Sequence, residues 1–140
     1  MSKHNQLITS DDGSHTLISN QFGVSYHSLH GAIQESRTVF LAAGLHFARH
    51  NLLTEIKILE MGFGTGLNAL LTLIEAEKYH FPIQFNTLEA YPISTQQADT
   101  LNYIDILDCS KYSDAFRLMH NTLSGQTLQL SKYYSFTKHI

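Results

Sequence analysis

Three glycines at alternate positions, Gly62, Gly64 and Gly66, lie between a short apolar run and a longer apolar segment with helical spacing. A tight glycine turn between a strand and a helix is an arrangement that binds nucleotides. Glycine permits the sharp turn and the close approach of a ligand, and the helix N-terminus offers free N–H groups. The spacing differs from the dinucleotide pattern G-x-G-x-x-G, and no Gly-Lys-Ser/Thr follows as in a P-loop. These residues therefore predict a site for an adenosine-containing ligand.

An acidic residue follows at the distance that such a site requires. Glu89 stands 23 residues after Gly66, at the end of the second predicted strand, in the stretch NTLEAYP. Neighbouring parallel strands end side by side, so we expect Glu89 beside the glycine loop, where its carboxylate can hold ribose hydroxyls. The two features at matching spacing are more specific than either alone. The alternative is an ordinary tight turn followed by a solvated glutamate.

The elements that must position these residues begin with an N-terminal segment of mixed pattern. The stretch QLITSDDGSHTLIS indicates two short strands around the turn Asp12-Gly13. Residues 22–37 show no clear period and are expected to be irregular. From Thr38 to Leu52 apolar residues recur at helical spacing, which predicts a helix.

From residue 55 onwards the pattern alternates between strands and helices. EIKILE predicts a buried strand, and TGLNALLTLIEAEKYH predicts the helix that follows the glycines. IQFNTLEAY predicts a second strand. ISTQQADTLNYI, with Ser94 as its cap, and SDAFRLMHNTL predict two further helices. QTLQLSKYYSFT alternates as one or two strands would. This order of elements predicts an α/β fold with helices packed on a parallel sheet.

Composition limits the class of protein. The chain has 140 residues, of which 43% are hydrophobic and 15% charged, which suits one folded domain and argues against disorder. The formal net charge is −3 and no run of lysine or arginine occurs, so an RNA contact would need a local basic patch. The N-terminus lacks an apolar signal core, and no apolar window is long enough for a membrane span. We therefore expect a soluble cytoplasmic protein.

Disulfide bonds and metal sites are not expected. Cys109 is the single cysteine, so the chain can form neither an intramolecular disulfide nor a thiolate zinc cluster. His46 and His50 lie four positions apart on a predicted helix, a spacing that can bind a metal. No third ligand is evident beside them in the sequence, so an ordinary pair on the helix surface is favoured.

Glu60 directly precedes the glycines and gives the pattern E-x-G-x-G-x-G, which resembles motif I of the S-adenosylmethionine methyltransferases. The stretches YHSLHGAIQESRTVFLAAGL, LEMGFGTGLNALL and LEAYP together resemble one family in that class. This is the tRNA 5-methylaminomethyl-2-thiouridine methyltransferase family, either stand-alone (MnmD-type) or as the methyltransferase domain of the bifunctional MnmC. The resemblance runs from about residue 8 to the C-terminus and covers the N-terminal portion of the family's domain. A nicotinamide-dependent oxidoreductase is an alternative that the glycine spacing disfavours.

The resemblance implies a Rossmann-like methyltransferase fold with S-adenosylmethionine as cofactor. Glu89 would hold the ribose hydroxyls, and Tyr91 would pack beside the adenine. The residues that match the family's motif around the methionine end of the cofactor are Glu60, Gly62, Phe63, Gly64, Thr65, Gly66 and Asn68.

The resemblance also implies a reaction and a partner. The family transfers a methyl group to the aminomethyl nitrogen on the wobble uridine of certain tRNAs, so tRNA would be the partner. The N-terminal motif, which would close over the cofactor and the target base, comprises Tyr26, His27, Gly31, Glu35 and Ser36.

In one respect the sequence departs from the family. The aspartate expected after the fourth strand, the best candidate for the catalytic carboxylate, has no counterpart, so no catalytic residue is assigned. We expect a sheet truncated after about the third strand. Residues 1–54 would form a hairpin and helix over the cofactor site, and residues 55–140 the first half of the sheet, within one domain. EIKILE would then be an apolar edge, open to pairing with another chain. The alternative to an active enzyme is a non-catalytic remnant that binds cofactor or pairs through this edge.

Overall fold

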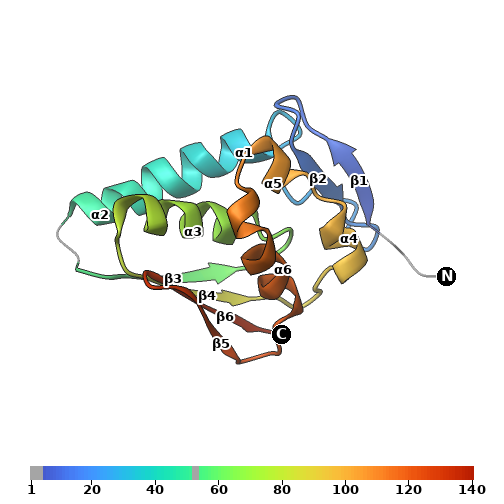
Figure 1. Cartoon of the computed structure of the whole chain (residues 1–140). Coiled ribbons are helices and arrows are strands. Elements are labelled where there is room, and N and C mark those ends of the chain that lie inside the picture. The colour runs from blue at the N-terminus through green and yellow to red at the C-terminus, as the bar shows by residue number, and fades with distance from the viewer. Residues whose placement is uncertain (1–4, 52–53) are drawn as a thin grey trace.

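The computed structural model describes residues 5–51 and 54–140 and shows a mixed α/β fold (Figure 1). Near the N-terminus, β1 (Gln6–Thr9) and β2 (His15–Ile18) form a small antiparallel sheet. A larger sheet contains β3 (Ile56–Met61), β4 (Ile83–Leu88), β5 (Thr127–Ser131) and β6 (Tyr134–His139).

The strands of the larger sheet lie in the order β3-β4-β6-β5. β3, β4 and β6 are parallel to one another, and β5 pairs antiparallel with β6. In this register Glu60 lies beside Thr87, which in turn lies beside Lys138. The carboxyl ends of the three parallel strands therefore share one edge of the sheet, which is where open α/β folds bind ligands.

A long helical rod and several shorter helices complete the fold. The rod runs from α1 (Ala32–Glu35) through the π-helical segment η1 (Ser36–His46) to α2 (Phe47–His50). α3 (Leu67–Tyr79) begins directly after the glycine loop. The remaining helices are α4 (Thr95–Asp99), α5 (Tyr103–Ile106), the 3-10 segment η2 (Ser110–Tyr112) and α6 (Ser113–Asn121).

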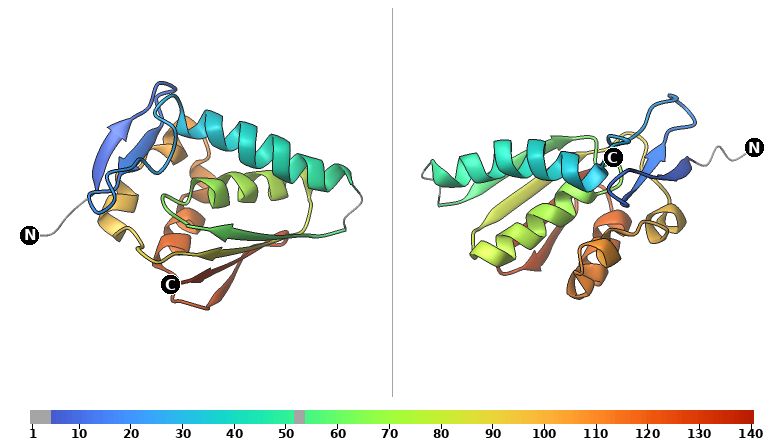
Figure 2. Two further views of the ribbon diagram at one scale, coloured as in Figure 1. Left: turned by 180° about the vertical axis from the view of Figure 1, so that it is seen from behind. Right: turned by 90° about the horizontal axis from the view of Figure 1, so that it is seen from above.

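The rod and α3 lie together over one face of the larger sheet, as Figures 1 and 2 show. Successive side chains of a strand point to opposite faces. Ile83 and Phe85 of β4 are buried on the helix-covered face. On β3, Leu59 and Met61 point the other way and are 66% and 76% exposed. Within the described residues no strand pairs with the outer side of β3, so β3 is an edge strand with apolar side chains in solvent.

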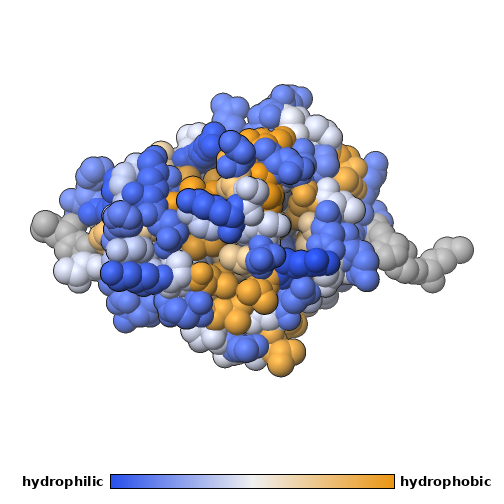
Figure 3. Space-filling view, viewed as in Figure 1, coloured by the Kyte–Doolittle hydropathy of each residue, from blue (hydrophilic) through white to orange (hydrophobic). Residues whose placement is uncertain are grey.

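Apolar surface is not confined to β3. Leu118 of α6 and Leu123, just after that helix, are also exposed. The space-filling view shows hydrophobic areas among hydrophilic ones in the middle of the face that Figure 1 presents (Figure 3). The buried apolar side chains form one core cluster.

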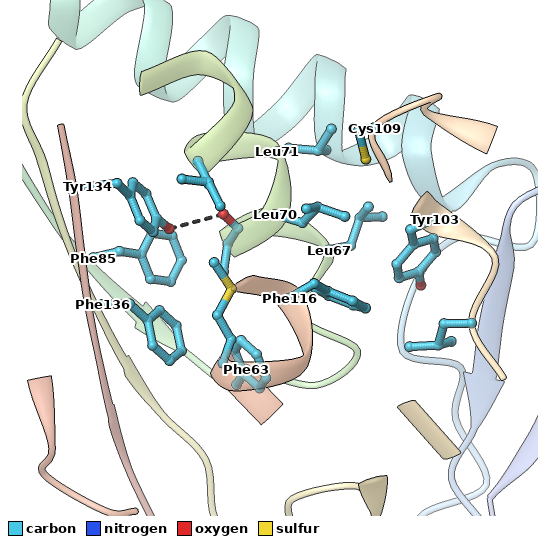
Figure 4. Packing of buried hydrophobic residues seen from close by; sticks show 14 of the residues in the cluster. Phe63, Leu67, Leu70, Leu71, Phe85, Tyr103, Cys109, Phe116, Tyr134 and Phe136 are labelled. Carbon is cyan, nitrogen blue, oxygen red and sulfur yellow. Dashed lines mark hydrogen bonds between the residues drawn. The ribbon is translucent and has the colours of Figure 1, made fainter. Parts of the chain in front are cut away.

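Aromatic rings form the centre of the core (Figure 4). Phe136 of β6 lies between Phe85 and Phe63, with ring centroids 6.0 Å and 5.5 Å away. Leu70 of α3 and Phe116 of α6 are buried in the same cluster. Phe63 belongs to the glycine loop, so the loop is anchored in the core by its own side chain.

One buried hydroxyl joins β6 to α3. The Tyr134 hydroxyl lies 2.8 Å from Thr72 Oγ1 and donates to the Ala69 carbonyl at 3.0 Å. Tyr134 and Thr72 are both fully buried. A buried hydroxyl needs such partners, because burial without them costs free energy.

Most of the elements predicted from the sequence are confirmed. The N-terminal hairpin turns at Asp12-Gly13, and the two C-terminal runs form β5 and β6. Ser94 caps α4 as predicted: its side chain accepts the Gln97 N–H, while the Gln97 side chain accepts the Ser94 N–H. The strand, helix and strand around the glycines also lie where the pattern places them.

The prediction of an irregular segment over residues 22–37 is wrong at its end, because the helical rod already begins at Ala32. The hairpin turn supplies the caps for this early start. Ser10 Oγ accepts the Ala32 N–H at 3.2 Å, and Asp12 Oδ2 accepts the Gln34 N–H at 3.0 Å. These contacts are tertiary, so no local pattern in the sequence indicates them. Leu52, at the other end of the predicted helix, lies outside the described residues.

The single helix predicted after Pro92 is also wrong, because α4 ends at Asp99 and a separate α5 follows. Asn102 lies in the break. Its side chain accepts the His15 N–H at 2.8 Å and donates to the Gly13 carbonyl at 3.0 Å. These contacts hold Asn102 against the hairpin, and its backbone carbonyl begins α5 by accepting the Ile106 N–H at 3.0 Å.

Removing the Tyr134 hydroxyl should destabilise the fold without changing its shape. We expect Tyr134→Phe to lower the free energy of unfolding by about 1 kcal/mol, since it deletes a buried hydrogen bond and leaves the ring in place. Urea unfolding followed by circular dichroism measures the change. Tyr133→Phe, at a half-buried neighbour, is the matched control and should shift stability by less than about 0.5 kcal/mol. Equal stability of Tyr134→Phe and the original protein would show that the hydrogen bonds of the Tyr134 hydroxyl do not stabilise the fold.

Candidate functional site

The glycine loop joins β3 to α3 through three residues with positive φ. The φ angles of Gly62, Gly64 and Gly66 are 89°, 55° and 78°. Residues with a Cβ rarely adopt such angles, so the sequence uses glycine here. A Cβ on Gly64 would lie 2.9 Å from the Tyr26 ring, whereas one on Gly62 would meet nothing within 4 Å. No protein atom therefore covers the Gly62 backbone on the side where a Cβ would stand.

Glu89 lies beside this loop, as the strand order predicts. Its Oε2 accepts the Gly64 N–H at 2.7 Å, and its Oε1 accepts the Tyr91 N–H at 2.8 Å. A carboxylate has about four acceptor positions, so two backbone bonds leave capacity for further hydroxyl donors. The ends of β3 and β4 are thus joined through one carboxylate.

Glu60 is the buried acid of the site. Asn68 Nδ2 donates to its Oε1 at 3.0 Å, and Thr87 Oγ1 donates to its Oε2 at 2.9 Å. Burial raises the pKa of Glu60 to about 7, against the lowering effect of these two donors, and the negative charge of Glu89 raises it further. Glu60 therefore changes its charge near neutral pH.

The N-terminal segment packs on the glycine loop. The Tyr26 ring lies over Gly64, and burial together with the charge of Glu89 raises the pKa of its phenol. His27 Nε2 lies 3.0 Å from Thr65 Oγ1. Burial lowers the pKa of His27, although the nearby Glu35 carboxylate opposes this. The structure thus brings the predicted N-terminal motif and the predicted loop together.

Thr65 is the point where several segments meet. Its hydroxyl lies 3.0 Å from both the His27 ring and the Tyr103 hydroxyl. Its carbonyl lies 3.2 Å from His120 Nε2. Burial, and then the positive charge of Lys138, lowers the pKa of His120 to about 4. Tyr103 and His120 were not predicted as site residues, because they come from helices that are distant in the sequence from the glycine loop.

Two adjoining cavities open at this edge of the sheet. The first has a volume of about 300 Å³ and the second about 460 Å³. Both are lined by Tyr26, His27, Glu60, Gly62 and Asn68.

The first cavity lies over the loop and extends to Glu89 and Tyr91. Phe22 and Val24 also line it, and the Phe22 ring meets Tyr91 edge-on at 5.5 Å. These two apolar residues were not predicted as site residues, since they lie in a segment without a regular period. Phe63 lines the cavity as well as the core.

The second cavity lies between the rod and β3. Glu35 and Ser36 line it, together with Val39 and Phe40 of the rod and Leu59 and Met61 of β3.

Gly31 lines neither cavity. A Cβ there would lie 2.7 Å from Asp12 Oδ2, so this glycine makes room for the hairpin turn. Thr65 and Gly66 support the loop from behind and also do not line the cavities.

The remaining candidates have structural surroundings. His46 Nε2 lies 2.7 Å from Glu75 Oε2, which joins the rod to α3. Cys109 is a buried free thiol. Over residues 5–51 and 54–140, no cluster of three or more His, Cys, Asp or Glu side chains could hold a metal. Nor does this part of the chain contain a helix long and apolar enough to cross a membrane.

Comparison with known proteins supports the resemblance seen in the sequence. The chain is 37% identical over 97 residues to the tRNA 5-methylaminomethyl-2-thiouridine biosynthesis bifunctional protein MnmC of Burkholderia multivorans. It is 40% identical over 88 residues to MnmC of an Acidovorax species, and 33% over 87 residues to that of Leptospira interrogans. The matches cover 64%, 60% and 59% of this chain, but only 14%, 13% and 13% of the relatives' length. No protein-family model matches the chain.

A solved structure shares the fold. MnmC2 from Aquifex aeolicus superimposes with a TM-score of 0.71 at 17% sequence identity, over 98% of this chain and 42% of that one. This likeness confirms the predicted α/β fold class with a mostly parallel sheet. Together with the sequence matches, it confirms the resemblance to the MnmC family as one to the N-terminal portion of longer proteins.

The buried Glu60 should make stability depend on pH in a specific direction. Its pKa is about 7 in the folded chain and 4.5 as the unperturbed value. The folded state therefore binds more protons between these values, and the contribution of Glu60 is lost as pH rises through 7. Relative to Glu60→Gln, the original protein should lose about 3 kcal/mol of unfolding free energy from pH 4.5 to 7.5. Urea unfolding at several pH values measures this difference.

The comparison with Glu60→Gln is needed because His120 acts in the opposite direction. Its pKa is lowered from 6.5 to about 4, so its contribution is lost as pH falls. Taking the difference between the two proteins cancels the His120 contribution. Parallel stability curves for the two proteins would contradict the raised pKa of Glu60.

Proposed function

We propose that this chain binds S-adenosylmethionine in the first cavity and forms the cofactor-binding part of a tRNA methyltransferase. The observation that carries the proposal is the position of the Glu89 carboxylate. It accepts a hydrogen bond from the Gly64 N–H and lies beside the Gly62 backbone, where nothing would lie within 4 Å of a Cβ. A ligand with a ribose and a charged amino-acid end suits an acidic cavity of this kind. The proposed substrate is the aminomethyl group of 5-aminomethyl-2-thiouridine at the wobble position of tRNA. The names of the similar MnmC proteins support this choice.

The donors and acceptors of the first cavity fit the proposed cofactor. Glu89 has acceptor capacity left for ribose hydroxyls, and Tyr91 and Phe22 provide an aromatic wall for a purine. Glu60 offers a carboxylate to the ammonium group of the methionine part. Gly62 allows a ligand to approach the backbone closely. When bound, the cofactor supplies a methyl group on positively charged sulfur.

The second cavity is the proposed place for the target base. It shares Tyr26, His27 and Glu60 with the first cavity, so a base placed there would face the cofactor's reactive end. Orienting two reactants in this way is a large part of what such an enzyme can contribute. The base must leave its stack to enter the cavity. We place this activity in the cytoplasm, with tRNA as the partner.

A second candidate function rests on the outer edge of β3. Leu59 and Met61 are exposed there, and β3 has no neighbour on that side within the described residues. An edge with unpaired backbone groups and apolar side chains favours pairing with another strand. The chain would then be a non-catalytic cofactor-binding or pairing module, or would depend on a second polypeptide for catalysis.

Binding of S-adenosylhomocysteine tests the proposed cofactor site. We expect saturable binding by isothermal titration calorimetry. Affinity should fall about tenfold or more in Glu89→Ala, because this substitution removes both the contact with the ribose and the hydrogen bond to the Gly64 N–H. Gly64→Val should abolish binding, since its Cβ would displace Tyr26. Glu75→Ala, on the far part of α3, is the control and should bind normally.

Absence of binding by a folded chain would refute the proposed cofactor site. Preferential binding of a nicotinamide dinucleotide would favour an oxidoreductase instead.

Self-association tests the proposed role of the β3 edge. Sedimentation velocity should show concentration-dependent association of the chain. The double substitution of Leu59→Lys and Met61→Lys should suppress it, because charged residues on an edge oppose strand pairing. A monomer at all concentrations up to about 100 μM, far above a micromolar Kd, would contradict this role.

A further inference from the structure

The second cavity is lined by the carboxylates Glu35 and Glu60, by His27 and by neutral polar and apolar side chains, with no lysine or arginine among its described lining residues. Glu35 and Glu60 enter it from opposite sides, and His27 lies between the rod and the glycine loop. A cavity of this composition favours a positively charged ligand.

Hydrogen bonds around Thr65 bear on which nitrogen of His27 carries the proton. The Tyr103 hydroxyl donates to the His15 carbonyl at 2.7 Å and to Thr65 Oγ1 at 3.0 Å. Thr65 Oγ1 also lies 3.0 Å from His27 Nε2 and can accept its proton. In the neutral tautomer that makes this hydrogen bond, Nδ1 has no proton and can accept one.

Glu35 provides a second acceptor beside that nitrogen. Its Oε2 accepts the Ser28 N–H at 2.7 Å and lies 3.7 Å from His27 Nδ1. This separation is too long for a direct hydrogen bond, so neither atom satisfies the other. One ammonium nitrogen about 2.9 Å from each atom could donate to both. The Glu35 side chain is 43% exposed, so a ligand can reach it.

We propose that Glu35 and His27 together receive the aminomethyl nitrogen of the substrate, an assignment that rests on the proposed function. Glu35 binds the ammonium form. His27 Nδ1 takes one proton from it, and the imidazolium so formed lies against the Glu35 carboxylate. The neutral amine keeps the lone pair that forms the new bond to the methyl carbon. With S-adenosylmethionine bound, this lone pair would take the methyl group, and the electron pair of the broken carbon–sulfur bond would stay on sulfur.

The groups that face His27 come from four elements. Glu35 belongs to α1, and Glu60 lies across the cavity on β3. Tyr103 of α5 and His120 of α6 reach it only through Thr65. The Glu35 carboxylate favours imidazolium once an ammonium has given up its proton, while burial lowers the pKa of His27 and favours the neutral ring in the free chain. The pair is thus arranged to accept a proton only when a ligand brings one.

The alternative is that Glu35 and His27 have a purely structural role and only hold the loop after β2 in place. The two roles differ in their response to an amine. The test uses 5-aminomethyl-2-thiouridine nucleoside as the probe and 2-thiouridine as the ligand without an amine. Both are titrated by NMR into the free chain and into the chain with S-adenosylhomocysteine. Histidine labelled with ¹⁵N reports the tautomer of His27, assigned through His27→Gln.

We expect His27 to carry its proton on Nε2 and the amine-bearing nucleoside to bind about tenfold more tightly than 2-thiouridine. Glu35→Gln should remove most of this preference, yet keep an acceptor for the Ser28 N–H. The preference should also fall as pH drops through the lowered pKa of His27, since imidazolium repels an ammonium. Glu75→Gln is the matched control: it neutralises another glutamate that pairs with a histidine, and should leave the preference unchanged.

A proton on Nδ1 of neutral His27 would overturn the proposal. So would equal or undetectable binding of the two nucleosides, or an amine preference that survives Glu35→Gln. These outcomes are separate from failure of the proposed function, which would show as no binding of S-adenosylhomocysteine whatever the nucleosides do.

Discussion

The hydrogen bond from the Gly64 N–H to the Glu89 carboxylate joins the two strand ends on which the candidate site depends. It exists because β3 and β4 are parallel and in register, so that the loop after one strand ends beside the acid after the other. The positive φ angles of the glycines bring the backbone to the carboxylate, and Phe63 anchors the same loop in the core. The site is therefore formed largely by the scaffold, before any ligand binds.

The N-terminal segment depends on the same loop from the other side. The Tyr26 ring rests on Gly64, and Thr65 connects His27 to Tyr103. Through Tyr103 the network reaches the hairpin carbonyl of His15. A ligand that shifts the glycine loop would therefore also shift the hairpin and the rod. The two cavities share Tyr26, His27 and Glu60 in their lining, so cofactor and substrate positions are coupled in the proposed enzyme.

The sequence alone indicated the parts of the fold and site that local chemistry determines. Glycine spacing and strand order sufficed to place Glu89 beside Gly64, and a capping pattern located the start of α4. Tertiary contacts determined the rest. The early start of the rod needs Ser10 and Asp12 of the hairpin, and the break after α4 needs Asn102 against that hairpin. The roles of Tyr103, His120 and Phe22 likewise follow from packing between distant segments, which leaves no pattern in the sequence.

Proton exchange on binding S-adenosylhomocysteine tests the central claim most directly, because it reports on Glu60 inside the cavity. Titration calorimetry at pH 7 in buffers of different ionisation enthalpy gives the number of protons released. The pKa of Glu60 is about 7 in the free chain, and an ammonium group beside it should lower that pKa. The account predicts release of about half a proton at pH 7, which Glu60→Gln abolishes. Binding with no proton release, or with release unchanged in Glu60→Gln, would show that the ligand does not bind beside Glu60.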